Sequence, residues 1–438
     1  MSLVRDARFR LASLLALALI LLPVVLAGCN VKSGGFIISK PAHVRFFNAL
    51  VDGGSINVTI GDNAVLSGLP FEGLTSYEDI DSGNREVKIS VAGGTSTIVD
   101  STILFTDDAS STYLIYGTSA APVAQQISDT TTDAGGGQFL LRVTNAAYGS
   151  EGFDVYVTPP GTPLDNTSPN VSNVPYAITT AFGLFAAGSY QLRMTLPNSK
   201  QVIYDAGTLT FNERASYFLV VYTKGSSTLV NAALLNIDTA GDGSIVNNKL
   251  AQFKVVHAAP GTAAINAFVD GSVAFANIPY QGASSYEALT AGPHTVTVET
   301  VTAPGAVIAQ AQPPFAPATD TSIVVTGTPG SQTAIVLADS NLPGTAGSAR
   351  MRFVNVTPNL GPVDAYVNFA PRALALATNA ASGYVELAEN TYTVNFDVAG
   401  TTTVLLTVPS IALTAGRSYT LYLVGTSGQL AGVLTRDD

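Results

Sequence analysis

A short apolar segment that carries a basic residue recurs four times along the chain. The basic residue is Arg45, Arg142, Lys254 and Arg352 in turn, so the intervals are 97, 112 and 98 residues. A period near 100 residues is too long for a solenoid repeat and has the size of one small domain. The spacing therefore predicts four tandem domains, at residues 42–128, 138–238, 250–340 and 348–438.

Alternation within each repeat favours β-strands. In the fourth repeat, Tyr392, Val394, Phe396 and Val398 alternate with polar residues. Strict alternation of this kind is typical of a strand with one face on a core and the other in water. Sustained helical periodicity is missing after the first 28 residues, and turn residues separate short apolar runs. The fold class that follows is all-β, with four tandem antiparallel β-sandwiches of Ig-like or Greek-key type.

The first 28 residues have the composition of a signal peptide. Three arginines precede an apolar run over residues 11–26, and Leu26-Ala27-Gly28 then lead to Cys29. The run is short for a membrane span and suits a signal-peptide core, although a membrane anchor beside a buried cysteine is the alternative. The four residues resemble the bacterial lipobox. This resemblance implies that Cys29 carries acyl chains such as palmitate, and that residues 29–41 form a lipidated tether.

Charge and cysteine content restrict the location and the partners. Removing residues 1–28 takes away three Arg and one Asp, which changes the formal net charge from −11 to −13. Such a chain is not expected to bind nucleic acid or anionic lipid headgroups. Cys29 is the only cysteine, so an intramolecular disulfide is excluded. In the proteobacterial sorting rule, Asp after the lipidated Cys favours the inner membrane. Asn30 therefore favours the outer membrane.

The histidines do not predict a catalytic or metal site. His257 stands where the other repeats have Asn48, Asn145 and Asn355, so a local hydrogen bond at a strand end is the expected role. His43 and His294 are spread over two domains without the spacing of zinc ligands. A Ser-His-Asp hydrolase is the rival interpretation. The chain has no Gly-x-Ser-x-Gly elbow to support it.

A second candidate is the segment around Asp238 and Asp242, which has some features of a calcium loop. Counted from Asp238, position three is Ala240 and position twelve is Lys249, where an EF-hand loop has a bidentate Glu. A turn in a linker is the better interpretation, and a weak interdomain Ca²⁺ site stays open as the alternative. No cofactor is expected.

The third repeat contains motifs of a known family. They are Val255-Val256-His257-Ala258-Ala259-Pro260, Phe268-Val269-Asp270-Gly271, Pro279-Tyr280 and Ala291-Gly292. These residues resemble the DUF4397 family. The resemblance extends over nearly all of the chain after the signal peptide, as four copies of which the first is the most divergent. It implies a secreted or lipid-anchored bacterial β-sandwich with no assigned catalytic residues.

Together these patterns predict a non-enzymatic, lipid-anchored protein of the bacterial cell envelope. Short Gly-containing linkers favour an articulated rod of four sandwiches with a structural, adhesive or interaction role, held to the membrane by the acyl chains on Cys29. A glycan- or cell-wall-binding module is the alternative. Tyr77, Tyr286 and Tyr384 recur in register, and they are expected to pack between sheets rather than on sugar rings.

Overall fold

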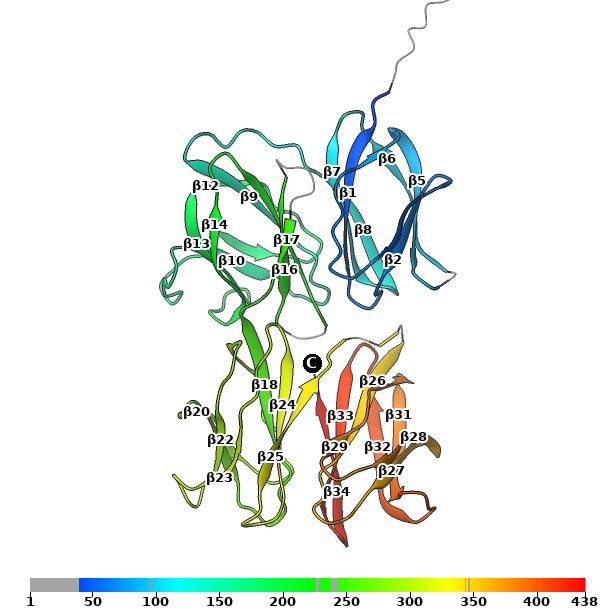
Figure 1. Cartoon of the computed structure of the whole chain (residues 1–438), viewed down its shortest axis with the longest axis vertical. Coiled ribbons are helices and arrows are strands. Elements are labelled where there is room, and N and C mark those ends of the chain that lie inside the picture. The colour runs from blue at the N-terminus through cyan, green and yellow to red at the C-terminus, as the bar shows by residue number, and fades with distance from the viewer. Residues whose placement is uncertain are drawn as a thin grey trace, which may run out of the picture.

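The computed structural model describes residues 39–94, 96–225, 228–237, 243–342, 344–345 and 347–437. These residues form eight β-sheets, which pair into four β-sandwiches, and none of them is helical (Figure 1). The prediction of an all-β chain of tandem sandwiches is confirmed. The predicted signal peptide and Cys29 lie outside the described residues. Over the part that is described, the search for a membrane-spanning helix finds none.

The first two sandwiches share one strand order, apart from an extra edge strand in the second. Sandwich 1 contains β1 (Ala42–Leu50), β2 (Ile56–Ile60), β3 (Asn63–Leu69), β4 (Glu78–Ile80), β5 (Gly83–Val91), β6 (Thr97–Phe105), β7 (Ser110–Thr118) and β8 (Ala121–Ser128). Sandwich 2 contains β9 (Gln138–Asn145), β10 (Phe153–Thr158), β11 (Val171–Val174), β12 (Gly183–Ala186), β13 (Gly188–Thr195), β14 (Val202–Phe211), β15 (Ser216–Tyr222), β16 (Asn231–Asn236) and β17 (Gly243–Val246).

The last two sandwiches repeat the same order. Sandwich 3 contains β18 (Leu250–His257), β19 (Ile265–Val269), β20 (Ser272–Ile278), β21 (Glu287–Thr290), β22 (Val296–Thr300), β23 (Val307–Ala311), β24 (Asp320–Thr326) and β25 (Thr333–Asp339). Sandwich 4 contains β26 (Ser348–Asn355), β27 (Val363–Val367), β28 (Ala370–Leu376), β29 (Ala380–Ala381), β30 (Val385–Ala388), β31 (Asn390–Val398), β32 (Val404–Leu413), β33 (Ser418–Thr426) and β34 (Gln429–Arg436).

Each sandwich has one sheet that carries the recurring basic residue, which we call the clamp sheet. In order, the clamp sheets are β4-β1-β7-β8, β12-β9-β15-β16-β17, β21-β18-β24-β25, and β29-β26-β33-β34 with β30 also paired to β26. The opposite sheets, which we call the outer sheets, are β3-β2-β5-β6, β11-β10-β13-β14, β20-β19-β22-β23 and β28-β27-β31-β32. Their long strands follow the predicted alternation. Val394 and Phe396, for example, are buried in the core. The alternation ends after Phe396, since Asp397, expected in water, is buried and Val398, expected in the core, is exposed.

The centre of every clamp sheet contains a parallel pair that the antiparallel sandwich prediction did not include. These pairs are β1 with β7, β9 with β15, β18 with β24, and β26 with β33, whereas the other strand pairs of the described residues are antiparallel. Nearly every residue of these eight strands is buried on either face. Burial of both faces is normal for parallel strands, and it requires a second layer on the far side of the clamp sheet.

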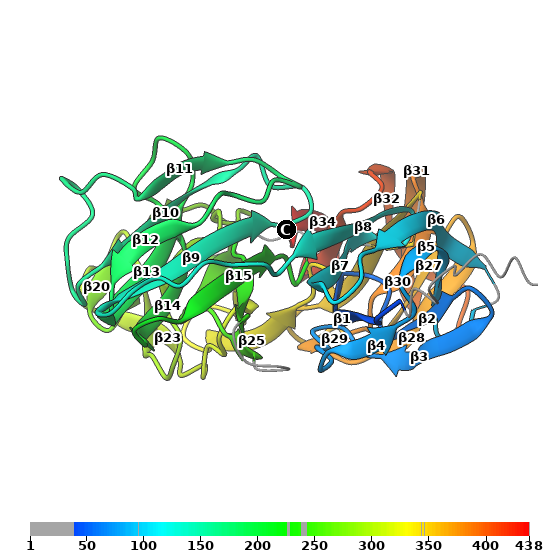
Figure 2. The same ribbon diagram turned by 90° about the horizontal axis from the view of Figure 1, so that it is seen from above.

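That second layer is the clamp sheet of the neighbouring sandwich. One apolar cluster joins sandwiches 1 and 2 and includes Phe47, Leu114, Phe218 and Tyr222. A second cluster joins sandwiches 3 and 4 through residues such as Val256 and Tyr422. Figure 1 shows the two pairs as an upper and a lower tier, and Figure 2 shows sandwiches 1 and 2 side by side from above. The expected articulated rod is therefore wrong, because sheet-to-sheet packing makes two face-to-face pairs.

The connection between the two tiers is also fixed by contacts. The predicted second domain ended at residue 238, but β17 extends the clamp sheet of sandwich 2 by pairing with β16. Asn248 then follows and is fully buried. Its amide donates to the carbonyls of Ile203 and Val230, and its oxygen accepts from the N–H groups of Asp205 and Leu250. Four hydrogen bonds to one side chain hold this linker in place instead of leaving it as a flexible joint.

Candidate functional site

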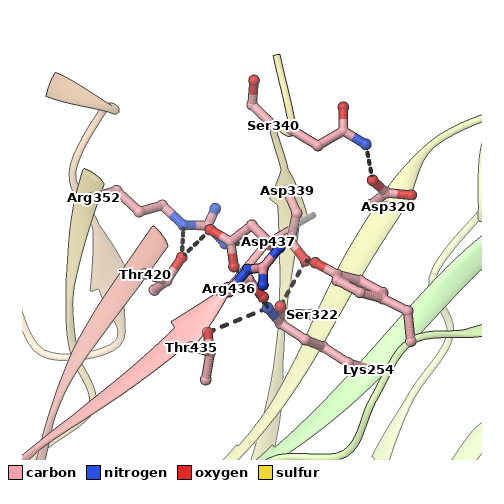
Figure 3. Close-up of polar contacts among 12 residues, drawn as sticks. Lys254, Asp320, Ser322, Asp339, Ser340, Arg352, Thr420, Thr435, Arg436 and Asp437 are labelled. Carbon is pink, nitrogen blue, oxygen red and sulfur yellow. Dashed lines mark hydrogen bonds and ion pairs between the residues drawn. The ribbon is translucent and has the colours of Figure 1, made fainter. Parts of the chain in front are cut away.

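A buried polar cluster links sandwiches 3 and 4 and contains two of the recurring basic residues (Figure 3). Lys254 Nζ lies 2.7 Å from Asp437 Oδ1, across the interface between the two sandwiches. Arg352 of sandwich 4 pairs in turn with Asp339 of sandwich 3, and its Nε donates to Thr420 at 2.7 Å. The side chains of these four charged residues are at most 4% exposed. We call this set the lower clamp, because each basic residue holds the carboxylate at the end of the other sandwich.

Tyrosines complete the lower clamp. The hydroxyl of Tyr286 donates to Asp339 at 2.6 Å, and that of Tyr384 donates to Asp437 at 2.7 Å. The ring of Tyr286 lies 4.7 Å from Lys254 Nζ, and that of Tyr384 lies 4.9 Å from the Arg352 guanidinium. Each tyrosine therefore contacts a cation with its ring and a carboxylate with its hydroxyl. Hydrogen bonds and cation–π contacts together compensate for the burial of four charges.

The electrostatics of the lower clamp favour the charged forms. Burial alone would lower the pKa of Arg352, but Asp339 and its neighbours outweigh this and raise it. Burial likewise opposes the charged form of Asp437, yet Lys254 and Arg352 hold its pKa below the usual value. Burial raises the pKa of Tyr286, and Asp339 adds to the effect, so the hydroxyl remains a donor. These shifts describe a closed ion-pair network. None of them prepares a group for proton transfer near neutral pH.

Sandwiches 1 and 2 carry a related set, the upper clamp. Arg142 donates to Asp129 Oδ1 at 2.8 Å, and Arg45 Nε lies 3.6 Å from Asp129 Oδ2. Arg45 also donates to the carbonyl of Asn236 in sandwich 2 at 3.0 Å. Tyr77 donates to Asp129 at 2.7 Å. Both arginines therefore contact the same buried carboxylate, which comes from the end of β8.

Sandwich 2 lacks the polar half of this arrangement. Ile237 follows β16, the last long strand of sandwich 2, and donates its N–H to the carbonyl of Ser216. Asp437 occupies the same position in sandwich 4, where its N–H donates to the carbonyl of Ser418. Phe182 and Phe218 stand where other sandwiches have a tyrosine and a hydroxyl residue, and both rings lie within 4.9 Å of the Arg142 guanidinium. Burial lowers the pKa of Arg142 although Asp129 acts against it. The upper clamp is thus asymmetric, with apolar rings replacing one carboxylate and its donors.

The recurring tyrosines lie between sheets, but not within one sandwich. Tyr77, Tyr286 and Tyr384 were expected inside each sandwich core, and the structure places them between the clamp sheets of two sandwiches. The sequence contained a signal for this arrangement. An Asp follows the basic residue of repeats 1, 3 and 4 by 84, 85 and 85 residues, at Asp129, Asp339 and Asp437.

The Pro-aromatic step that recurs in three repeats also serves this interface. Phe71 of sandwich 1 packs on Tyr222 of sandwich 2 with ring centroids 5.9 Å apart, and Tyr176 of sandwich 2 packs on Tyr116 of sandwich 1 at 5.7 Å. Glu72, next to Phe71, accepts from the Tyr222 hydroxyl at 2.7 Å. These reciprocal contacts make the step a docking element between sandwiches 1 and 2, whereas Tyr280 of the third copy packs on His257 of its own sandwich.

His257 has the local role that its equivalence to Asn predicts. Its Nε2 lies 3.0 Å from the Ala263 carbonyl, and its Nδ1 faces the N–H of Ala259 at 3.4 Å. Asn355 makes the same two kinds of bond, to the carbonyls of Gly361 and Leu376 and from the N–H of Thr357. The pattern requires a neutral imidazole with the proton on Nε2, because Nδ1 must accept. Burial lowers the pKa of His257 accordingly.

This assignment makes stability depend on pH in a defined direction. The folded chain binds a proton at His257 less readily than the unfolded chain, whose histidine pKa is about 6.5. Stability is therefore complete above about pH 6.5 and is lost as the pH falls towards the lower folded pKa. We expect His257→Asn to fold normally and to lose this component of the pH dependence, as measured by urea denaturation at several pH values. Equal pH profiles for both proteins would contradict the assignment.

The other two histidines pair with exposed aspartates rather than with the clamp carboxylates. His43 Nδ1 is 2.7 Å from Asp79, and His294 Nδ1 is 2.7 Å from Asp270. The Nε2 of His294 lies 2.9 Å from the carbonyl of Thr290, so both of its ring nitrogens are engaged. The predicted loop at Asp238 and Asp242 lies outside the described residues. Within those residues no group of three or more His, Cys, Asp or Glu side chains suits a metal ion.

A cavity of about 1000 Å³ opens where sandwiches 2, 3 and 4 meet. Its wall includes the polar side chains of Gln201, Gln281, Ser285 and Glu287, and it extends to Tyr286 of the lower clamp. Its volume is at the upper end of the range for small-molecule sites, which commonly lie at domain junctions.

Comparison with known proteins assigns the family. A family model described as a domain of unknown function (DUF4397) matches residues 42–156, 251–366 and 357–438, which is more than half of the chain. The chain belongs to the DUF4397 family. The first two DUF4397 matches continue past one sandwich to β10 and β27 of the next. Each therefore includes the Asp that ends one sandwich and the basic residue of the following one, here Asp129 with Arg142 and Asp339 with Arg352.

Other comparisons add little. No curated protein matches the chain. Among solved structures, the Bacillus anthracis TIE protein is similar at 11% sequence identity, over 86% of this chain and 69% of that chain, with a TM-score of 0.15. That score carries no argument about the fold or the role of this DUF4397 protein.

Proposed function

We propose that this DUF4397 protein is a non-enzymatic, lipid-anchored protein of the bacterial envelope. Its sandwiches, four DUF4397-like repeats, form a compact scaffold with a structural, adhesive or interaction role, held at the outer membrane by acyl chains on Cys29. One observation carries the proposal. The charged residues that recur in register, Arg45, Arg142, Lys254 and Arg352, are buried in contacts that join sandwiches. The most regular chemistry of the chain is therefore engaged in holding its domains together.

The histidines support a non-enzymatic role. A general base needs a ring nitrogen that can reach a substrate or a nucleophile. Both nitrogens of His257 and of His294 are engaged with neighbouring backbone or side-chain groups. Burial lowers the pKa of His257, backbone hydrogen bonds at Ala263 and Thr262 oppose that shift, and no carboxylate is among the groups that act on the ring. This environment suits a structural hydrogen bond better than acid–base catalysis.

The cavity between sandwiches 2, 3 and 4 favours a second candidate function, the binding of a glycan or cell-wall fragment. Amide, hydroxyl and carboxylate groups line it, and Tyr286 lies at its wall. Such groups recognise sugar hydroxyls by hydrogen bonding, and an aromatic ring can stack on a sugar face. The cavity is concave, and both polar and apolar side chains line it.

A glycan array probed with the full-length chain in detergent separates the two functions. The scaffold proposal expects no saturable binding to any glycan or peptidoglycan fragment. Binding that Gln281→Ala and Glu287→Ala reduce, and that Gln126→Ala in sandwich 1 leaves intact, would overturn it in favour of the second candidate.

The anchor has its own test. We expect Cys29→Ser to abolish labelling by a radioactive or clickable fatty acid and to release or mislocalise the protein, because the thiol is the acylation site. Two or more acyl chains are needed for stable attachment, so the loss is expected to be complete. Labelling that persists in Cys29→Ser would contradict the proposed lipidation. An unlabelled wild-type protein that stays in the membrane would favour the alternative of a membrane anchor.

A further inference from the structure

The outer sheet of sandwich 4 places two carboxyl groups opposite each other on adjacent strands. Asp364 of β27 is the direct cross-strand partner of Asp397 of β31. Val363, Ala365, Val394 and Phe396 face the core, so both aspartates project from the other face of the sheet. Directly opposed residues have Cβ atoms about 5 Å apart, and like charges at such positions repel each other.

The two carboxyl groups differ in their hydrogen bonding. Asp364 accepts from the N–H of Ala375 at 2.6 Å and from the N–H of Gly400 at 2.8 Å. Asp397 is only 8% exposed, and its Oδ1 is shielded from solvent without a hydrogen-bond partner. The turn that contains Gly400 folds towards the pair. A buried carboxylate oxygen with no donor, beside a second carboxylate, is a costly arrangement unless a cation compensates it.

A third oxygen lies on the same face. Asn395, two residues before Asp397 on β31, also projects away from the core, and its Oδ1 is likewise shielded and without a partner. Its direct cross-strand partner is Tyr366. Two carboxyl groups and one carboxamide oxygen thus lie on neighbouring positions of two strands. Oxygen ligands of this kind bind hard divalent cations, and nitrogen or sulfur ligands that would favour zinc or copper are not part of this group.

The same positions in the other sandwiches show that the arrangement is particular to sandwich 4. The equivalent cross-strand pairs are Asn57 with Ser90, Asp154 with Thr195, and Asn266 with Glu299. Sandwiches 2 and 3 each have a single carboxylate there. Asp154 accepts from the N–H groups of Asn173 and Asn198, and Glu299 Oε2 accepts from the N–H of Gly305 at 2.7 Å. A pair of carboxyl groups is therefore not needed to build this sheet. Its presence in sandwich 4 calls for a ligand.

We propose that Asp364, Asn395 and Asp397 bind a calcium ion on the outer sheet of sandwich 4. Asp397 supplies Oδ1, which has no donor, Asn395 supplies its side-chain carbonyl, and Asp364 shares an oxygen that also accepts a backbone N–H. Water completes the six to eight ligands that Ca²⁺ prefers. Mg²⁺ fits less well, because it demands regular octahedral geometry and gives up its water reluctantly. With few charged ligands, the dissociation constant is expected near 10⁻⁴–10⁻³ M, on the order of values for extracellular calcium modules.

The repulsion between the carboxyl groups of Asp364 and Asp397 is consistent with a cation-binding site. Burial raises the pKa of Asp397, and Asp364 adds to the rise. A bound divalent cation would reverse the balance by stabilising both ionised forms. The ion would also tie β27 to β31 and to the turn at Gly400. This makes the outer sheet of sandwich 4 the part of the molecule whose stability responds to calcium.

Terbium luminescence tests the proposal, since Tb³⁺ replaces Ca²⁺ and is excited through a nearby tyrosine. The chain has no Trp, and Tyr366 lies on the same face as the site. For the full-length chain in detergent we expect saturable Tb³⁺ luminescence that millimolar Ca²⁺ displaces. Asp397→Asn is expected to weaken Ca²⁺ binding at least tenfold, and Asn395→Ala to weaken it less. Glu299→Gln, the matched control in sandwich 3, is expected to leave it unchanged.

Thermal unfolding gives an independent readout. In EDTA, Asp397→Asn is expected to unfold at the same or a higher temperature than wild type, because the repulsion is removed, and Ca²⁺ is expected to raise the unfolding temperature of wild type only. No saturable binding by wild type up to about 10 mM Ca²⁺ would overturn the site. Calcium affinity unchanged in both Asp397→Asn and Asn395→Ala would also overturn it. A third contrary result would be a wild-type unfolding temperature that does not change with Ca²⁺ and falls only at higher pH, where Asp364 and Asp397 lose a shared proton.

Discussion

Replacing Asp339 with alanine is expected to cost about 3–5 kcal/mol of unfolding free energy in sandwiches 3 and 4. The substitution leaves the Arg352 guanidinium buried without its carboxylate, and it removes the acceptor for the hydroxyls of Tyr286 and Ser322. The cost comes from the groups that remain, since a buried charge and buried donors without partners are more unfavourable than the lost pair was favourable. Urea denaturation followed by tyrosine fluorescence measures it.

An exposed ion pair supplies the control for this prediction. Asp108 pairs with Lys40 at 2.7 Å, and both side chains are more than half exposed. Asp108→Ala is expected to leave stability unchanged, because solvent screens such a pair. If Asp339→Ala were as harmless as Asp108→Ala, the lower clamp would not hold sandwiches 3 and 4 together.

Phe46 and Phe47 are adjacent residues that test sandwich pairing directly. Phe46 faces the core of sandwich 1 and packs against Tyr113. Phe47 faces the other way, into the cluster shared with sandwich 2, with its ring 5.6 Å from that of Tyr222. Truncation of a buried Phe to Ala costs about 3–5 kcal/mol. We expect Phe46→Ala and Phe47→Ala both to show a loss of this size in denaturant unfolding.

The two substitutions would differ in their effect on stability if sandwiches 1 and 2 did not pack together. In an isolated sandwich the side chain of Phe47 would lie in water, and its removal would cost little. A destabilising Phe46→Ala together with a neutral Phe47→Ala would therefore refute the paired arrangement while leaving the sandwich fold intact.

Much of the fold could be predicted from the sequence because its signals are local. Alternation around Val394 identifies strands without reference to any other repeat, and the recurrence of the basic residue identifies the domain period. Comparison among repeats also predicted the role of His257, since three Asn residues at its position favour a local hydrogen bond there. The structure shows the corresponding bonds at His257 and at Asn355.

Pairing of the sandwiches could not be predicted from those signals, for a physical reason. A strand buried on both faces, such as β18, lacks the alternation that tells which face meets which neighbour. The carboxylate partner of Lys254 is Asp437, which lies 183 residues away in another sandwich, so no local pattern identifies this pair. The Asp that ends each repeat would have shown the clamp, but Ile237 breaks the series in sandwich 2. The fifth strand of that clamp sheet, β17, is likewise fixed by its pairing with β16 and not by a local sequence signal.

Small-angle X-ray scattering of the chain tests the central claim, that the sandwiches form two clamped pairs in two tiers. Using the size of a compact domain of about 90 residues, four sandwiches in two tiers give a radius of gyration of roughly 25 Å, whereas four in an extended rod give roughly 37 Å. We expect the smaller value, unchanged between low and high salt because the clamps are buried. A radius near that of the rod would contradict the paired arrangement.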